Sequence, residues 1–206
     1  MSLADHGGLA RRSIDVLGAS FGLLLISPVM ILAIVAVKAT SRGPVFFPQE
    51  RVGQNGRSFK LWKLRTMIVG ADKLKTALAA GGNGNTDSIR FKIKRDPRIT
   101  PVGRVLRKLS IDEMPQLWNV IIGDMTLVGP RPPIWREVNL YDARALRRLE
   151  VKPGLTCLWQ VGGRSDLSFD QQVDLDLTYI DRIRPFDEIV IVARTVPAVI
   201  TGRGAY

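Results

Sequence analysis

The sequence predicts a predominantly helical α+β fold, in which an N-terminal re-entrant membrane helix accompanies interfacial amphipathic helices and a small β-hairpin. Three observations predict it: a long uncharged apolar segment near the N-terminus, an Asn-Gly turn between two short extended runs, and repeated helix-start signals further along. The chain has 206 residues, enough for a membrane element joined to one compact domain. We therefore divide it into an N-terminal segment, residues 1–42, and a domain, residues 43–206.

The apolar segment, residues 16–37, contains no charged side chain. As a straight helix it would be about 33 Å long, close to the thickness of a bilayer core. A secretory signal fits poorly, because the apolar run is longer than a typical signal core. A membrane helix is therefore expected, and a buried helix of a soluble protein remains the alternative.

Two features indicate that this helix enters the membrane and turns back. Ser27 and Pro28 lie near its centre, where proline removes a backbone hydrogen bond and kinks or breaks a helix. Basic residues flank both ends, with Lys38 and Arg42 after the segment, which favours keeping both ends on the cytoplasmic side. A re-entrant helix in one leaflet is predicted; a kinked spanning helix stays open, because prolines also occur in helices that cross.

The segment after the membrane helix, residues 44–64, predicts a β-hairpin. Two short extended runs flank Gln54-Asn55-Gly56, and Asn-Gly tolerates the positive φ that tight hairpin turns need. Residues 69–80 then have a helical pattern, and the composition of residues 81–88 predicts a flexible loop.

Two helix starts follow in quick succession. Thr100 as N-cap, followed by a proline, predicts a short basic helix over residues 102–109. Ser110 and Glu113 have the spacing of a capping box, in which each side chain binds the other residue's backbone amide. Asp112 would then lie in the first helical turn, where free amides and the helix dipole favour its ionised form.

The C-terminal part predicts more helix. Residues 135–150 have an amphipathic pattern, and Ser168 with Gln171 gives another capping-box start. The last apolar stretch, residues 188–200, is interrupted by Arg194 and a proline, so it is too short and too broken to span a bilayer. It is either part of the core or a helix that lies on the membrane surface.

Charge and cysteine content restrict the classes of partner. The 30 Lys and Arg against 19 Asp and Glu give a formal net charge of +11, which suits nucleic acid, anionic lipid or phosphorylated small molecules. Nucleic acid is disfavoured by the apolar segment and by the lack of a recognisable nucleic-acid-binding motif. A single cysteine, Cys157, and a single histidine, His6, exclude an intrachain disulfide and a Cys/His zinc site.

Asp112 and Glu113 form a carboxylate pair in this basic chain. Acidic residues are common in first helical turns, and for Glu113 this structural explanation is strong. It explains less for Asp112, because Arg107 precedes the pair and Arg131 follows it in a stiff Gly-Pro-Arg-Pro turn, and guanidinium groups held this way bind phosphate. A carboxylate among phosphate-binding cations indicates a magnesium ligand or a nucleophile on phosphorus.

The chemistry of such a nucleophile can be followed one step further. An aspartate that attacks phosphorus forms an acyl phosphate, which can pass its phosphoryl group to a second acceptor. A site at the membrane interface would limit hydrolysis by water and could present a lipid acceptor. Lys63 and Arg65 are further candidates for phosphate binding, although solvent-facing or lipid-facing cations fit them equally well.

Several long motifs in this order resemble one family, the bacterial sugar transferases known as monotopic phosphoglycosyl transferases. They are residues 96–132, the Ser27-Pro28 pair, residues 153–169 and residues 202–206. The resemblance implies that a sugar phosphate moves from a UDP-sugar to undecaprenyl phosphate, giving a polyprenyl-diphosphate-linked sugar and UMP. It further implies a domain facing the cytoplasm at the bacterial inner membrane and a role in exopolysaccharide, capsule or lipopolysaccharide assembly. The long C-terminal motif resembles the branch that transfers hexose phosphates such as galactose or glucose.

The resemblance also implies roles for individual residues. Asp112 would be the nucleophile of a two-step, ping-pong mechanism and would contact Mg²⁺, with Glu113 supporting the metal or phosphate environment. The remaining roles are phosphate contact by Arg107, contact with the nucleotide end of the donor by Pro130, Arg131 and Pro132, and a helix break at Ser27 and Pro28.

A non-catalytic membrane adaptor is the main alternative class. A basic surface of this size would suffice for binding anionic lipid, since each Lys or Arg near a membrane surface contributes about 1 kcal/mol. That alternative leaves the Asp-Glu pair and the Gly-Pro-Arg-Pro turn unexplained. A homo-oligomer is compatible with the sequence under either interpretation.

Overall fold

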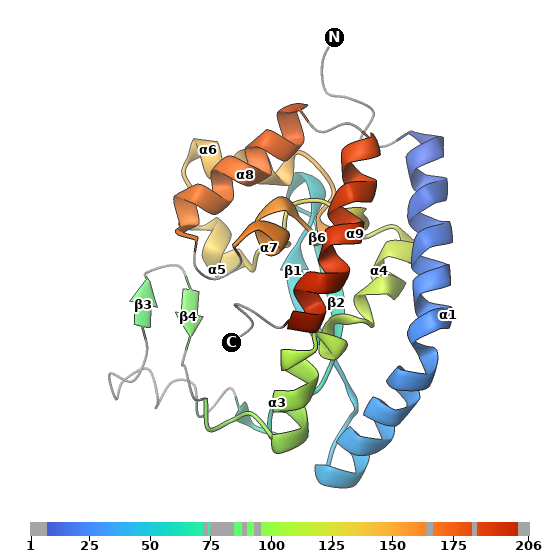
Figure 1. The fold of residues 1–206 in the computed structure, drawn as a ribbon. Coiled ribbons are helices and arrows are strands. Elements are labelled where there is room, and N and C mark those ends of the chain that lie inside the picture. Colours follow the sequence, from blue (N-terminus) through green and yellow to red (C-terminus); the bar gives the residue numbers. More distant parts are fainter. Residues whose placement is uncertain are drawn as a thin grey trace.

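The computed structural model describes residues 8–71, 74, 85–87, 90–92, 96–163, 167–182 and 185–201. The predicted predominantly helical α+β fold is confirmed: a long N-terminal helix runs along one side of the molecule, and the shorter helices gather around a central hairpin (Figure 1). The elements are α1 (Leu9–Thr40), β1 (Phe46–Val52), β2 (Ser58–Leu64), β3 (Asn85–Asp87), β4 (Arg90–Lys92), α3 (Pro101–Lys108), α4 (Gln116–Ile122), β5 (Thr126–Val128), α5 (Trp135–Val138), α6 (Ala143–Leu146), β6 (Gly154–Thr156), α7 (Leu158–Gly162), α8 (Phe169–Arg182) and α9 (Pro185–Thr201), with 3₁₀ turns at Gln54–Gly56, Ile111–Glu113 and Arg147–Leu149.

The predicted break at Ser27-Pro28 is a bend inside one continuous helix. Pro28 lies within α1 and lacks the N–H that would bind the Leu24 carbonyl, four residues earlier. The Ser27 hydroxyl donates to that same Leu24 carbonyl at 2.8 Å. Because the side chain replaces the missing backbone donor, α1 changes direction part-way along without ending (Figure 1).

One side of α1 packs against the domain along its length. In its first half, Ala19 is fully buried in a cluster with Leu117 of α4. In its second half, Ala33 and Val37 pack in a second cluster with Leu64 of β2. The other side exposes large apolar side chains, and α1 is long and apolar enough to cross a membrane. Such an apolar surface indicates contact with lipid.

The predicted β-hairpin is confirmed. β1 and β2 pair antiparallel from Phe46 opposite Leu64 to Val52 opposite Ser58. Asn55 has φ 55° and Gly56 has φ 76°, the left-handed backbone that the Asn-Gly signal predicted for the turn.

Two of the predicted helix starts are confirmed. The Thr100 hydroxyl accepts from the Gly103 amide at 2.9 Å at the start of α3. At α8, the Ser168 amide donates to Gln171 at 2.9 Å and the Gln171 amide donates back to the Ser168 hydroxyl at 3.3 Å. Both motifs are local, so the sequence alone is enough to predict them.

Other secondary-structure predictions were wrong or lie outside the described residues. Residues 135–150 form α5, α6 and a 3₁₀ turn instead of one helix, because Asp142 caps a new start by accepting from the Ala145 amide at 2.7 Å. Asn85–Asp87, inside the predicted loop, form a strand paired with β4. Most of the predicted helix over residues 69–80 lies outside the described residues.

A short parallel pair, β5 and β6, joins the middle of the chain to the C-terminal helices. Thr126 lies opposite Gly154, and Val128 lies opposite Thr156. A Cβ atom on Gly154 would come within 2.0 Å of the Gly129 amide nitrogen, so the close approach of the two segments requires glycine there. On α9, Ile191 is buried and Ile189 is exposed. The last apolar stretch therefore contributes both to the core and to the surface.

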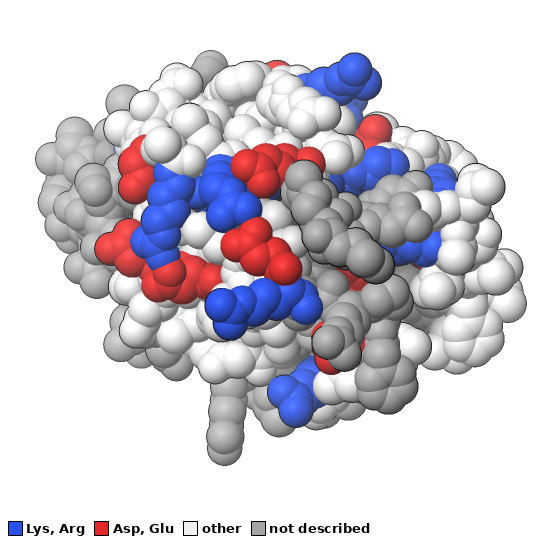
Figure 2. Space-filling view, turned by 90° about the horizontal axis from the view of Figure 1, so that it is seen from above, with Lys and Arg blue, Asp and Glu red and all other residues white. Residues whose placement is uncertain are grey.

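Acidic and basic side chains lie side by side on the face formed by α6, α8 and the 3₁₀ turn after α6 (Figure 2). Arg144 forms an ion pair with Asp174, and Arg147 contacts Asp181 at 2.6 Å. Exposed pairs of this kind contribute little to stability. Because Arg144 and Arg147 have carboxylate partners, charges of both signs alternate on this face instead of forming a continuous basic surface.

Candidate active site

Asp112 and Glu113 lie in a tight turn between α3 and α4. Ser110, which precedes them, has φ 53° and makes no capping bond with its side chain. The predicted capping box is therefore wrong: tertiary contacts place Ser110 in left-handed backbone and take the Glu113 side chain elsewhere. A non-glycine residue in this conformation is uncommon and indicates that the surrounding structure imposes the turn.

The Glu113 carboxylate pairs with Lys63 of β2. The Lys63 Nζ lies 2.7 Å from Glu113 Oε1, and the two side chains are 15% and 25% exposed. The charge of Lys63, reinforced by those of Arg131 and Arg51, lowers the pKa of Glu113 to about 2. Glu113 is therefore ionised at any physiological pH and fixes the position of Lys63 beside Asp112.

Asp112 is only 7% exposed. Burial, and then the negative charge of Glu113, raises the pKa of Asp112 to about 6, while the charges of Lys63 and Arg107 oppose this rise. The carboxylate is thus mostly ionised at neutral pH but poorly solvated, as a nucleophile or a phosphate-site ligand requires. Arg107 is held in place by the bond from its Nε to the Thr66 hydroxyl at 2.8 Å.

The Pro130-Arg131-Pro132 turn follows β5 and is fixed through its carbonyl groups. Its prolines have no N–H to donate, so their carbonyls supply the anchoring contacts. The Pro130 carbonyl accepts from the Gly154 amide at 2.9 Å, and the Pro132 carbonyl accepts from Arg51 Nη1 at 2.9 Å. Arg131 therefore projects from a backbone that β6 holds on one side and β1 on the other.

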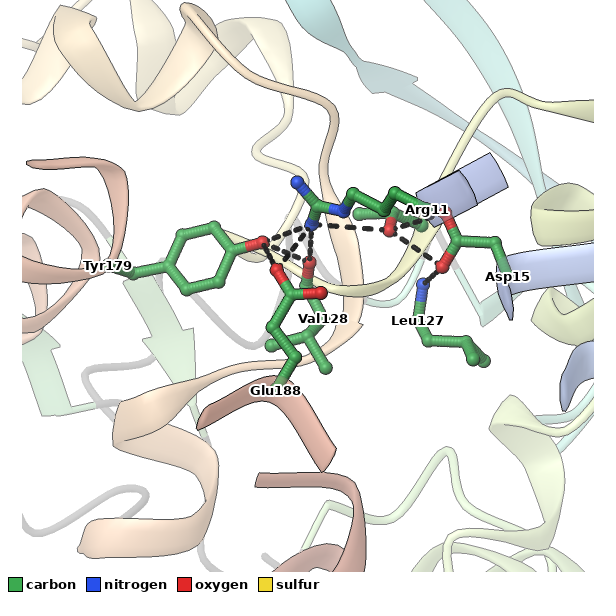
Figure 3. A network of polar contacts seen from close by, with 7 residues as sticks. Arg11, Asp15, Leu127, Val128, Tyr179 and Glu188 are labelled. Carbon is green, nitrogen blue, oxygen red and sulfur yellow. Dashed lines mark hydrogen bonds and ion pairs between the residues drawn. The ribbon is translucent and has the colours of Figure 1, made fainter. Parts of the chain in front are cut away.

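A network around Arg11 fixes the strand that leads into this turn (Figure 3). The Val128 carbonyl, three residues before Arg131, accepts from Arg11 at 3.0 Å and from the Tyr179 hydroxyl at 2.6 Å. Arg11 also contacts the Tyr179 hydroxyl and pairs with Glu188 at 2.8 Å. The start of α1 is thereby joined to α8, α9 and the end of β5.

Asp15, one turn further along α1, completes this attachment. It is 7% exposed and accepts from the Thr126 hydroxyl at 2.8 Å and from the Leu127 amide at 2.9 Å (Figure 3). The polar residues at the start of α1 thus contact the domain, which leaves the apolar remainder of its outer side for lipid.

A small cavity brings four of the predicted residues, Lys63, Glu113, Arg131 and Pro132, together with others that the sequence did not indicate. The predicted residues Asp112, Arg107, Pro130 and Arg65 do not line it. The empty space there, counted together with open solvent, is about 250 Å³. Its walls are Arg51, Leu61, Lys63, Glu113, Gln116, Arg131, Pro132, Gly154, Leu155 and Gln160.

Comparison with known proteins identifies the family. Residues 7–202 match the family described as bacterial sugar transferase. The chain belongs to this family. It is 46% identical over 202 residues to the exopolysaccharide production protein ExoY of Rhizobium meliloti, covering 97% of this chain and 89% of that protein.

Two further relatives have more specific names. One is the undecaprenyl-phosphate galactose phosphotransferase of Salmonella typhimurium, 39% identical over 198 residues, covering 95% of this chain and 41% of that protein. The other is the UDP-glucose:undecaprenyl-phosphate glucose-1-phosphate transferase of Caulobacter vibrioides, 39% identical over 206 residues, covering 96% of this chain and 72% of that protein.

Arg65 occupies a different place in this transferase from the other predicted cations. Its two terminal nitrogens donate to the Arg42 and Ser41 carbonyls, each at 2.8 Å, and Arg65 as a whole is 8% exposed. These contacts close the C-terminal end of α1. They give Arg65 a structural role, and phosphate binding by Arg65 stays a prediction that its geometry does not favour.

The carboxylates allow one kind of metal site. Among the described residues, no group of three or more His, Cys, Asp or Glu side chains lies close enough to hold a metal ion. Mg²⁺ commonly binds through one or two protein carboxylates together with substrate phosphates. Asp112 fits that arrangement, whereas an all-protein metal cage does not fit the described part of this transferase.

Arg51, Gln116 and Gln160 are cavity residues that sequence reasoning missed. Gln160 accepts from the thiol of buried Cys157 at 3.1 Å. Gln116 could have been noticed, because it follows Asp112 by about one helical turn. Arg51 gave no local signal, since its partner at Pro132 is distant in the sequence.

Proposed function

We propose that this transferase moves a sugar-1-phosphate from a UDP-sugar to undecaprenyl phosphate, giving a polyprenyl-diphosphate-linked sugar and UMP. The observation that carries the proposal is the buried Asp112 carboxylate, which is surrounded by the charges of Lys63 and Arg107. The names of the Salmonella and Caulobacter relatives support an undecaprenyl-phosphate acceptor and a hexose donor such as UDP-galactose or UDP-glucose. The name of the Rhizobium relative supports a role in exopolysaccharide synthesis.

In the first half-reaction, an Asp112 oxygen attacks the donor phosphorus that carries the sugar. A bond forms between that oxygen and phosphorus, the bond from phosphorus to the UMP oxygen breaks, and UMP leaves with the electron pair. The guanidinium of Arg131, held by its anchored turn, and the ammonium of Lys63 offset the charge that develops on the phosphates. The product on the enzyme is a sugar phosphate joined to Asp112 as an acyl phosphate.

In the second half-reaction, an oxygen of undecaprenyl phosphate attacks the same phosphorus. The bond between phosphorus and Asp112 breaks, the carboxylate is restored, and the diphosphate-linked product leaves in the membrane. Because Asp112 is only 7% exposed, the acyl phosphate is shielded from water between the two steps.

We also propose Mg²⁺ as the cofactor, held by Asp112 together with the donor phosphates. It would supply neutralisation of the diphosphate charge. Glu113 is engaged by Lys63 at 2.7 Å, so its part is to hold that cation in place.

The packing of α1 supports a monotopic arrangement in the cytoplasmic membrane. Both halves of α1 share buried clusters with the same domain, through Ala19 at Leu117 and through Ala33 at Leu64. A helix crossing the whole bilayer would draw this charged domain into lipid, at high cost. Entry of α1 into one leaflet keeps the domain at the cytoplasmic surface, where the polar part of the lipid acceptor lies.

Loss of the nucleophile tests this function. Asp112→Asn should remain bound to membranes but release no UMP from UDP-glucose or UDP-galactose in the presence of undecaprenyl phosphate and magnesium. Exposed Glu50 on the hairpin provides the control, because Glu50→Gln removes a carboxylate that does not line the cavity and should leave UMP release unchanged. Normal turnover by Asp112→Asn would show that the nucleophile is another group.

A further inference from the structure

Gln116 is a buried residue whose side-chain amide has no hydrogen-bond partner among the described residues. It opens α4 about one turn after Asp112, is 4% exposed, and lines the cavity beside Lys63 and Arg131. Within the part of the chain that the structure describes, no hydrogen bond joins its side chain to another residue. Buried polar groups are nearly always hydrogen-bonded, because leaving one unsatisfied is costly. The Gln116 amide atoms are not among the fully buried atoms that lack a partner, so they reach the cavity, where water or a ligand can bind them.

Asn119, on the same helix, shows what a structural amide looks like here. It is 0% exposed, and its side chain donates to the Lys60 carbonyl at 2.7 Å and to Asp124 at 3.1 Å. Its oxygen accepts from the Trp62 amide at 3.0 Å. Asn119 thus attaches α4 to the hairpin, and Gln116, one turn earlier, is not needed for that attachment.

The side chains of the cavity restrict which group of a ligand can bind Gln116. The cations Arg51, Lys63 and Arg131 can only donate hydrogen bonds, which suits the oxygens of a diphosphate. An amide both donates and accepts, so it pairs best with a neutral group that does the same. In a nucleotide sugar, the sugar hydroxyls and the imide edge of the uracil have this character.

We propose that Gln116 binds a neutral hydrogen-bonding group of the donor and thereby contributes to donor selection. The inference rests on the proposed function, because it assumes that part of a UDP-sugar reaches this cavity. The sugar is bonded to the phosphorus that Asp112 attacks, so its hydroxyls come within reach of a side chain one turn along the same segment. The uracil edge is the second source of the same chemistry.

The test compares Gln116→Met with the wild type, using the intact chain in lipid nanodiscs. Methionine keeps the length of the side chain and removes the amide. UMP release is measured while UDP-glucose or UDP-galactose is varied, and then while undecaprenyl phosphate is varied. The donor KM is expected to rise about tenfold, which corresponds to the loss of about one hydrogen bond. The acceptor KM and the unfolding temperature should stay unchanged.

Asn119→Leu is the matched control, because it should lower the unfolding temperature through the loss of structural bonds. A Gln116→Met variant with an unchanged donor KM would overturn the proposal. So would equal rises in both KM values together with a lower unfolding temperature, since that pattern indicates a structural role.

Inhibition by UMP separates the two sources of the neutral group. If Gln116 binds the uracil, the inhibition constant of UMP rises in Gln116→Met by the same factor as the donor KM. If Gln116 binds the sugar, the inhibition constant of UMP is unchanged, and the preference between UDP-glucose and UDP-galactose shifts. Both results support the proposal. If the wild type released no UMP, the proposed function would be wrong, and equal affinities of wild type and Gln116→Met for UMP and UDP-glucose in a binding titration would refute the role of Gln116 separately.

Discussion

The burial of Asp112 predicts that removing its charge stabilises the protein. Burial beside Glu113 raises the pKa of Asp112 from 3.8 to about 6. At a pH between these two pKa values, Asp112 is protonated in the folded protein and ionised in the unfolded chain. The stability contributed by the neutral carboxyl is therefore fully present below the unfolded pKa and is lost as pH rises through the folded pKa. The full loss corresponds to about 3 kcal/mol at neutral pH and above.

Asp112→Asn is therefore expected to raise the free energy of unfolding by up to about 3 kcal/mol at about pH 8, and by much less at about pH 4. Denaturant unfolding of the detergent-solubilised protein measures both values. Exposed Glu50→Gln is the control and should change stability little at either pH. An Asp112→Asn variant that is less stable than the wild type at the higher pH, or that gains the same stability at both pH values, would contradict this effect of burial.

Three further predictions follow from the same geometry. In a ping-pong mechanism kcat/KM for the donor reports only the first half-reaction, so it should fall about tenfold per pH unit below about pH 6, and a flat profile would exclude ionised Asp112 as the nucleophile. Lys63→Met leaves Glu113 without its partner and should cost about 2–3 kcal/mol in denaturant unfolding; adding Glu113→Gln should recover most of the loss, and additive effects would contradict the pairing. Tyr179→Phe removes the 2.6 Å bond to the Val128 carbonyl and should raise the donor KM several-fold, so an unchanged KM would mean that this hydroxyl does not position the turn.

Local signals explain what the sequence could predict. The Asn55-Gly56 turn, the Thr100 cap and the Ser168 capping box depend on neighbours within four residues, and all three are present. The Ser110 capping box failed for the opposite reason. Long-range contacts, above all the pairing of Glu113 with Lys63, fix the turn around Asp112 and override the local preference.

The candidate site could be predicted only as a set of residue types. Asp112, Glu113 and Arg131 followed from their motifs, and the structure brings the last two together in one cavity with Lys63. The contact that fixes the end of β5 could not be predicted, because Arg11 and the Val128 carbonyl are 117 residues apart in the chain. Chain separation of that size leaves no periodicity or spacing in the sequence.

A covalent link between the sugar phosphate and Asp112 is tested most directly by supplying the donor without the acceptor. The intact enzyme is incubated with UDP-glucose or UDP-galactose and magnesium, quenched in acid, and the peptide containing Asp112 is examined by mass spectrometry. The mechanism predicts a hexose-phosphate adduct on Asp112, with about one UMP released per active molecule, and loss of the adduct when undecaprenyl phosphate is added. UMP release that occurs only with acceptor present, from an enzyme whose Asp112 peptide stays unmodified, would contradict it.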